Sequence, residues 1–200
     1  MTTVQQESTD MRTEYGKTLI EIGKENQNIV VLGADTTDSL KTAGFGKEFP
    51  KRFFNVGIAE ANLVSVAAGL AIEGKTAFAS TYATFLPGRA VDQIRNAIAY
   101  PSRENKKGLN VKLVVSHAGL TVGADGGSHQ QIEDIAIMRA IPNFRVLIPA
   151  DSIAVKKLTW IMSQEYGPFF MRMTRSKTPI VHTESQDFEI GKGITLVDGS

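Results

Sequence analysis

Short apolar runs alternate with amphipathic segments along most of the chain. The run 28–35, NIVVLGAD, is largely apolar until its end, which is typical of a strand buried on both faces of a sheet. The segment 11–26 places Tyr15, Leu19 and Ile22 on one face at helical spacing. This alternation predicts an α/β three-layer sandwich whose mainly parallel sheet has about six strands.

The rest of the chain repeats this alternation. Further strands are predicted at 52–57, 75–81, 111–116, 145–149 and 168–174, and further helices at 39–49, 59–73, 88–100, 132–141 and 151–166. Two longer connections, a charged loop and a glycine-rich loop, are expected at 101–110 and 117–131.

The length of 200 residues allows one good-sized domain or one domain and part of a second. The polar stretch 1–10 is expected to be a flexible tail, and 11–186 to be the domain. The segment 187–200 is expected to be a linker followed by the opening strand of a truncated further domain.

Composition narrows the classes of function. The 22 Lys and Arg residues nearly balance the 21 Asp and Glu residues, so charge does not indicate nucleic acid or an anionic membrane as partner. The absence of cysteine leaves no disulfide framework and no thiolate metal site. No apolar run approaches the ~20 residues of a membrane span, and the first ten residues lack an apolar signal core. We therefore expect a cytoplasmic protein that binds neither nucleic acid nor membrane.

Polar residues gather where the predicted strands end. In an open parallel sheet, ligands bind beyond the carboxyl ends of the strands. We therefore expect the functional site at that edge. The residues that fall there are Asp35, Glu60, Thr81, Tyr82, Ser116, His117 and Arg175.

Glu60 is the single charged residue between 55 and 72. It stands at the entrance to a helix that is apolar on nearly every face and should be buried. A carboxylate in a first helical turn is favoured by the helix dipole by ~0.3–1 kcal/mol, so a structural role is one interpretation. The other is a carboxylate in a dry site, where its proton affinity is raised and a ligand shares its proton. The position of Glu60 at the ligand edge favours the second interpretation.

The glycine-rich loop carries His117, Asp125 and His129. Such a loop lets the backbone approach a ligand closely, and neutral imidazoles can donate to sugar hydroxyls or shuttle protons. A zinc site is a competing interpretation, but the spacings fit no short metal motif. No metal ligand is therefore assigned.

Three further residues at the carboxyl edge of the predicted sheet have both a structural and a functional interpretation. Tyr82 and Phe85 are either core aromatics or a flat apolar wall for a heteroaromatic ring. Arg175 is either an ordinary surface charge or a planar fork that holds a phosphate.

Several segments resemble the pyrimidine-binding domain of transketolase, and they occur in the same order. They are GADTT, NVGIAEANLVSVAAGLA, TYATFL, SHAGLTVGADGGSHQQIED and NFRVLIPAD, and the resemblance runs over about residues 11–190. It implies an enzyme of the pentose phosphate pathway that uses thiamine diphosphate to move a two-carbon ketol unit between sugar phosphates.

The resemblance also implies a cofactor-binding set. Glu60 matches the catalytic glutamate that hydrogen-bonds the aminopyrimidine ring nitrogen and shares its proton. Phe85 matches a ring that stacks on the pyrimidine, and Asp35 matches an aspartate near the thiazolium. Tyr82 and Arg89 are placed beside the cofactor by the same resemblance.

On the substrate side, the resemblance implies that His117 and His129 are catalytic residues that contact donor-sugar oxygens. Asp125 matches a residue that reads a substrate hydroxyl, and Arg175 matches an arginine that binds the substrate phosphate.

One motif of these enzymes is absent. The stretch GDG…NN, which binds the diphosphate and Mg²⁺, does not occur in the chain. The resemblance therefore implies the carboxyl-side subunit of a split transketolase, with thiamine diphosphate shared and Mg²⁺ held by an amino-side partner. A homodimer or heterotetramer is expected.

Two alternatives stay open. The segment PGRAVDQ after Phe85 is closer to deoxyxylulose-phosphate synthase and to the β subunits of 2-oxo-acid dehydrogenases, because transketolases carry further aromatic residues there. The synthase has an arginine at the place of His117, so the histidine favours transketolase. The first alternative is thus a subunit of another thiamine enzyme, and the second is a non-catalytic assembly module.

Overall fold

The structure is a computed structural model that describes residues 8–103, 105–197 and 199. A central sheet of six strands has the order β3-β2-β4-β7-β9-β8, and every neighbouring pair is parallel. The predicted three-layer α/β sandwich is therefore confirmed. The strands are β2 (Ile29–Gly33), β3 (Phe53–Asn55), β4 (Thr76–Tyr82), β7 (Val111–Ser116), β8 (Arg145–Leu147) and β9 (Phe169–Arg172).

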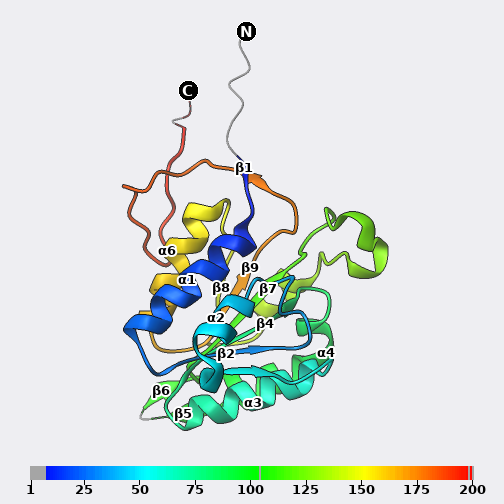
Figure 1. The fold of residues 1–200 in the computed structure, drawn as a ribbon, viewed down its shortest axis with the longest axis vertical. Helices are drawn as coiled ribbons and strands as arrows, with labels where there is room; N and C mark the ends of the chain where they lie inside the picture. Colours follow the sequence, from blue (N-terminus) through cyan, green and yellow to red (C-terminus); the bar gives the residue numbers. More distant parts are fainter. Residues whose placement is uncertain (1–7, 104, 198, 200) are drawn as a thin grey trace.

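Helices cover both faces of this sheet (Figure 1). One face carries α1 (Met11–Glu25), α2 (Ala43–Glu48) and α6 (Ser152–Gln164). The other face carries α3 (Glu60–Ile72), α4 (Leu86–Gln93), the π-helical turn η2 (Ile94–Ala99) and α5 (Asp134–Ala140).

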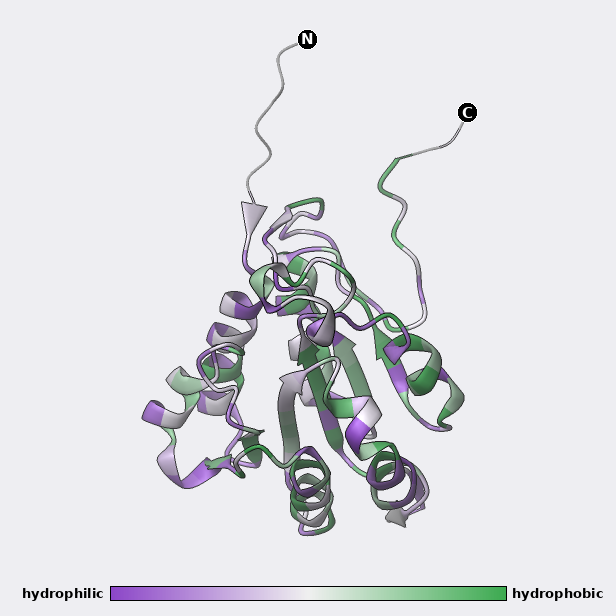
Figure 2. Cartoon of the chain, turned by 90° about the vertical axis from the view of Figure 1, so that its right-hand side faces the viewer, coloured by the Kyte–Doolittle hydropathy of each residue, from purple (hydrophilic) through white to green (hydrophobic). Residues whose placement is uncertain are grey.

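Successive side chains along each strand point to opposite faces of the sheet, so the core has one hydrophobic layer on each face. In β2, Val30 and Leu32 pack on the side of α3, whereas Ile29 and Val31 pack on the side of α1. All four side chains are buried, and burying each contributes ~1.5–3 kcal/mol. Figure 2 shows the hydrophobic colouring concentrated on the central strands, as this arrangement requires.

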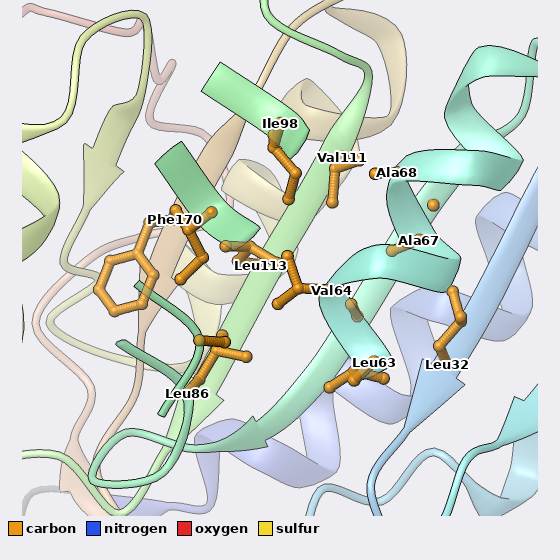
Figure 3. Packing of buried hydrophobic residues seen from close by; sticks show 14 of the residues in the cluster. Leu32, Leu63, Val64, Ala67, Ala68, Leu86, Ile98, Val111, Leu113 and Phe170 are labelled. Carbon is orange, nitrogen blue, oxygen red and sulfur yellow. The ribbon is translucent and has the colours of Figure 1, made fainter. Parts of the chain in front are cut away.

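Small residues bring α3 close to the sheet. Figure 3 shows Val64 and Ala67 of this helix lying against the strands, with Leu113 of β7 beside them. Buried side chains of α3 contact the strands directly, so the helix cannot shift without losing these contacts. Because Glu60 is the first residue of α3, this packing also fixes its position.

Several elements differ from the prediction. Helix α2 begins at Ala43 rather than 39, and the predicted helix 88–100 is divided into α4, which ends at Gln93, and the π-helical η2. Helix α4 begins at Leu86 rather than 88, because Pro87 is well suited to a first helical turn. The charged loop 101–110 contains a small antiparallel pair, β5 (Ser102–Arg103) and β6 (Lys106–Lys107). Its strands have two residues each, too few to give a readable alternation.

The two ends of the described chain also differ from the prediction. The predicted tail 1–10 is wrong for its last residues, because β1 (Ser8–Thr9) pairs with β10 (Thr178–Pro179) and Asp10 caps α1. Residues 1–7 lie outside the described residues. The opening strand expected in 187–200 does not form in the described part of that segment. Instead, Phe188 and Ile190 pack against the core.

Candidate active site

The predicted site residues lie at the carboxyl edge of the sheet. Asp35 follows β2, Tyr82 ends β4, His117 follows β7 and Arg175 follows β9. Because the strands are parallel, these positions share one edge. The glycine-rich loop 117–131 extends from the domain there (Figure 1).

A cluster of four rings forms the centre of the site. Tyr82 stacks on His117 with ring centroids 3.9 Å apart, and it lies 5.6 Å from Phe85. His129 approaches Phe85 edge-on at 5.2 Å and Tyr82 at 6.0 Å. The structure therefore brings together both histidines and both aromatic residues that the sequence singled out.

His117 is the most constrained residue of the cluster. Its backbone has a φ of 61°, a left-handed conformation that is uncommon outside glycine. Its side chain is only 2% exposed, and Nδ1 lies 2.8 Å from the hydroxyl of Ser116. Its Nε2 lies 3.7 Å from Asp125. The backbone, the Ser116 hydroxyl and burial together hold the imidazole in one orientation.

Burial, and after it the guanidinium of Arg12, lower the pKa of His117 from 6.5 to about 4 against the opposing effect of Asp125. The imidazole is therefore neutral at pH 7. A neutral ring can donate from one nitrogen and accept at the other, as contact with a sugar hydroxyl requires.

This lowered pKa predicts a pH-dependent stability. Between about pH 6.5 and pH 4 the unfolded chain binds a proton at His117 that the folded chain does not, so stability falls as the pH falls. The loss over this window is roughly 3 kcal/mol. Urea unfolding at pH 7 and pH 4 should show it in the parent and not in His117→Asn, because asparagine tolerates the left-handed backbone. An equal pH dependence of the two proteins would contradict the prediction.

Asp125 and Arg175 meet across the loop. Arg175 Nε lies 3.4 Å from Asp125 Oδ2, and its Nη1 donates to the carbonyl of Val122 at 2.9 Å. Asp125 Oδ2 is buried, and no hydrogen bond to it is made among the described residues. This carboxylate oxygen therefore has unused accepting capacity beside His117.

Glu60 lies in the first turn of α3 and is 5% exposed. Its Oε1 accepts a hydrogen bond of 3.0 Å from Arg89 Nη1, and its Oε2 takes no part in that pair. The same guanidinium lies 4.0 Å from the ring centre of Phe85. Arg89 thus joins Glu60 and Phe85, which the resemblance had assigned to one end of a cofactor.

Asp35 is separate from the ring cluster. It is exposed, has a φ of 57°, and exchanges hydrogen bonds with Asn55 of the neighbouring strand. The contacts that the structure describes join it to β3 and not to the histidines.

Two residues that sequence reasoning missed contact the site. Arg12, paired with Asp10 at 2.8 Å, is close enough to act on the pKa of His117. Ser39 accepts a hydrogen bond of 2.7 Å from the Tyr82 hydroxyl. Neither residue carries a local motif, because each comes into place only when α1 and the loop after β2 pack at the sheet edge.

Two other kinds of feature do not occur among the described residues. No three His, Cys, Asp or Glu side chains in that part of the chain gather as a metal site would require. Nor does that part contain a helix with the length and apolar character needed to cross a membrane.

The fold and the site together define an α/β domain whose candidate ligand site lies beyond the carboxyl ends of a parallel sheet. Residues 7–181 match the family described as the transketolase pyrimidine binding domain. The chain belongs to this family, and the resemblance seen in the sequence is confirmed.

Named relatives agree with this assignment. The chain is 52% identical over 191 residues to the "Putative transketolase C-terminal section" of Methanocaldococcus jannaschii, covering 94% of this chain and 58% of that protein. It is 35% identical to a 6-deoxy-6-sulfo-D-fructose transketolase subunit of Clostridium sp., covering 94% of this chain and 57% of that protein. A solved split gene transketolase, titled an inactive β4 tetramer, is 47% identical with a TM-score of 0.84, covering 96% of this chain and 60% of that one. The chain thus spans a little over half the length of these relatives.

Proposed function

We propose that the chain is the pyrimidine-side half of a thiamine diphosphate-dependent transketolase, which transfers a two-carbon ketol unit between sugar phosphates. The observation that carries the proposal is the almost fully buried carboxylate of Glu60 at the ligand edge of a transketolase pyrimidine domain. The relatives reported above carry the name transketolase, which favours this activity over the other thiamine enzymes.

The residues present fit the pyrimidine end of thiamine diphosphate. Glu60 offers an acceptor oxygen, Oε2, and Phe85 offers an aromatic ring, while Arg89 holds the two in one unit. When bound, the cofactor supplies the electron sink for breaking a carbon–carbon bond. Glu60 would hold a proton between its carboxylate and the pyrimidine ring of the bound cofactor. Asp35 would lie toward the thiazolium, and Tyr82 closes the site from the side of His117.

His117, His129 and Asp125 act on the sugar. The neutral imidazole of His117 orients a donor-sugar oxygen, and His129 lies across the ring cluster in position to contact a second. Asp125 Oδ2 accepts no hydrogen bond among the described residues, and it accepts one from a sugar hydroxyl. The low exposure of His117 keeps water from competing for these hydrogen bonds.

Two guanidinium groups support an anionic substrate. Arg12 and Arg175 both act on the pKa of His117, so both guanidinium groups lie near the proposed sugar site, each beside an aspartate. A guanidinium binds phosphate oxygens through a planar fork of donors. Sugar phosphates are therefore the substrate class that we propose.

The partner in this proposal is an amino-side transketolase subunit that holds the diphosphate and Mg²⁺. The names of the relatives support it, because one is described as a transketolase C-terminal section and one solved relative is a split gene transketolase. We further propose assembly as a homodimer or heterotetramer, action in the pentose phosphate pathway, and a cytoplasmic location.

Reconstitution tests this proposal. The purified chain should be folded, should bind thiamine diphosphate weakly, and should transfer no ketol units alone. Adding the amino-side subunit, thiamine diphosphate and Mg²⁺ should give transfer from xylulose 5-phosphate to ribose 5-phosphate. Strong transfer by the chain alone would contradict the need for a partner, and turnover of a 2-oxo acid in place of the ketose would identify another thiamine enzyme.

A further inference from the structure

A buried ion pair lies behind the glycine-rich loop. Asp134, in the first turn of α5, has a fully buried side chain, and its Oδ2 accepts from Arg172 Nε at 2.7 Å. Arg172 ends β9, where it pairs with Val115 of β7. Burying a charge pair has a desolvation cost that its attraction does not always offset, so such a pair is weak evidence of a purely stabilising role.

Two backbone hydrogen bonds between Gly119 and Gln131 join the ends of the loop next to this ion pair. We call this pair of residues the neck of the loop. Gly119 donates to the carbonyl of Gln131 at 2.8 Å, and Gln131 donates back to the carbonyl of Gly119 at 3.1 Å. Gly119 has a φ of 82°, a conformation that side-chain-bearing residues rarely adopt. Between these two residues the chain carries both Asp125 and His129.

One guanidinium lies against both sides of this neck. Arg172 Nη2 reaches the carbonyl of Gln131 at 3.4 Å, and a β-carbon at Gly119 would lie 3.6 Å from the same nitrogen. Asp134, three residues after Gln131, holds the same guanidinium through its Nε. The position of the neck is therefore tied to β9 and α5 through Arg172.

The pair is incompletely hydrogen-bonded. Asp134 Oδ1 is buried, and no donor to it is found among the described residues. A half-satisfied carboxylate in the interior is costly, and such exceptions call for a reason beyond packing. Its location under a loop of functional residues supplies one.

We propose that Arg172 and Asp134 are positioning residues for the substrate. The pair fixes both ends of the loop 119–131, and thereby sets where Asp125 and His129 lie. The role in catalysis rests on the function proposed above, whereas the control of the loop does not.

Hydrogen exchange of the full chain tests the control of the loop. In Arg172→Met/Asp134→Asn both charges are removed together, so no unpaired charge stays buried. We expect the amides of Gly119 and Gln131 to exchange about tenfold faster or more, because a local opening costs less when the neck loses its support. The amides of α6 should be unchanged. The matched control is Arg145→Met/Glu165→Gln, which removes an ion pair between β8 and the end of α6.

Kinetics of the reconstituted enzyme test the effect on the substrate. A shift of about 1 Å in a positioned group can cost on the order of 10²-fold, so kcat/KM for the ketose phosphate should fall roughly 10- to 100-fold. Thiamine diphosphate affinity should stay within about twofold of the parent, because the cofactor set lies outside the loop.

A third variant separates positioning from folding. Arg172→Lys keeps the charge beside Asp134 but lacks the fork that also reaches Gln131. It should keep the melting temperature near that of the parent and still show faster loop exchange and a lower kcat/KM. Unchanged loop exchange in the double variant would overturn the proposal. Faster exchange with unchanged kcat/KM would overturn its catalytic part. An inactive parent would count against the proposed function and leave the exchange result intact.

Discussion

Replacing Glu60 with glutamine is expected to lower ketol transfer by the reconstituted enzyme by ~10²–10⁴, the span typical of a positioned proton-transfer group. Glutamine keeps the size of the side chain and removes the charge and the shareable proton. The buried position of Glu60 makes this change local, because the carboxylate is 5% exposed and its one described hydrogen bond goes to Arg89. Steady-state assays with saturating thiamine diphosphate would measure the effect.

The stability of the Glu60→Gln variant distinguishes the two interpretations of this residue. A helix-dipole role would cost ~0.3–1 kcal/mol in unfolding free energy and leave activity intact. A catalytic role would lower activity strongly and leave the unfolding free energy little changed, or raise it by removing a partly buried carboxylate. The matched control is Glu73→Gln, an exposed glutamate at the carboxyl end of α3, where the dipole effect has the opposite sign. This change should raise the unfolding free energy by ~0.3–1 kcal/mol and leave activity unchanged.

Replacing His117 with asparagine is expected to have the second large effect. Loss of the neutral imidazole should lower kcat/KM for the ketose phosphate by ~10²–10⁴, while thiamine diphosphate affinity stays close to that of the parent. Asparagine accepts the left-handed backbone at this position, so the loss is not attributable to strain. Calorimetry with thiamine diphosphate and initial-rate kinetics would separate the two quantities.

The control for this variant is His182→Gln. His182 is also a mostly buried histidine, but it binds Asp151 at the start of α6, outside the ring cluster. Its loss should lower stability and leave kcat/KM of the folded enzyme unchanged. A His117→Asn variant that loses cofactor affinity would instead place His117 on the thiamine.

Much of the fold could be predicted because the apolar runs are strong and regular. β7 was predicted with its observed bounds, since VKLVVS is a buried run between a charged loop and a glycine-rich one. The pair β1–β10 could not be predicted, because its two partners are short, polar and far apart in sequence. The buried Lys112 was also missed. Its charge sits within an otherwise apolar run, and its Nζ is satisfied by the carbonyls of Glu165 and Gly167 at 2.7 Å.

The site residues that could be predicted are those that directly follow or end a predicted strand. Tyr82, His117 and Arg175 could be placed at one edge because parallel strands bring their carboxyl ends together. The left-handed backbone of His117 and the access of Arg12 to it could not be read from the sequence, because both depend on how the loop and α1 pack. For the same reason the sequence did not show that Arg89 lies between Glu60 and Phe85.

The most direct test of the central claim is the exchange of the proton on C2 of the thiazolium ring, followed by NMR in the reconstituted complex. The claim is that Glu60 of this chain completes a cofactor site begun by its partner. Exchange should be fast with the parent chain and slower by ~10²–10⁴ with Glu60→Gln. An exchange rate in Glu60→Gln equal to that of the parent would show that Glu60 is a structural residue at a helix start and would contradict the account.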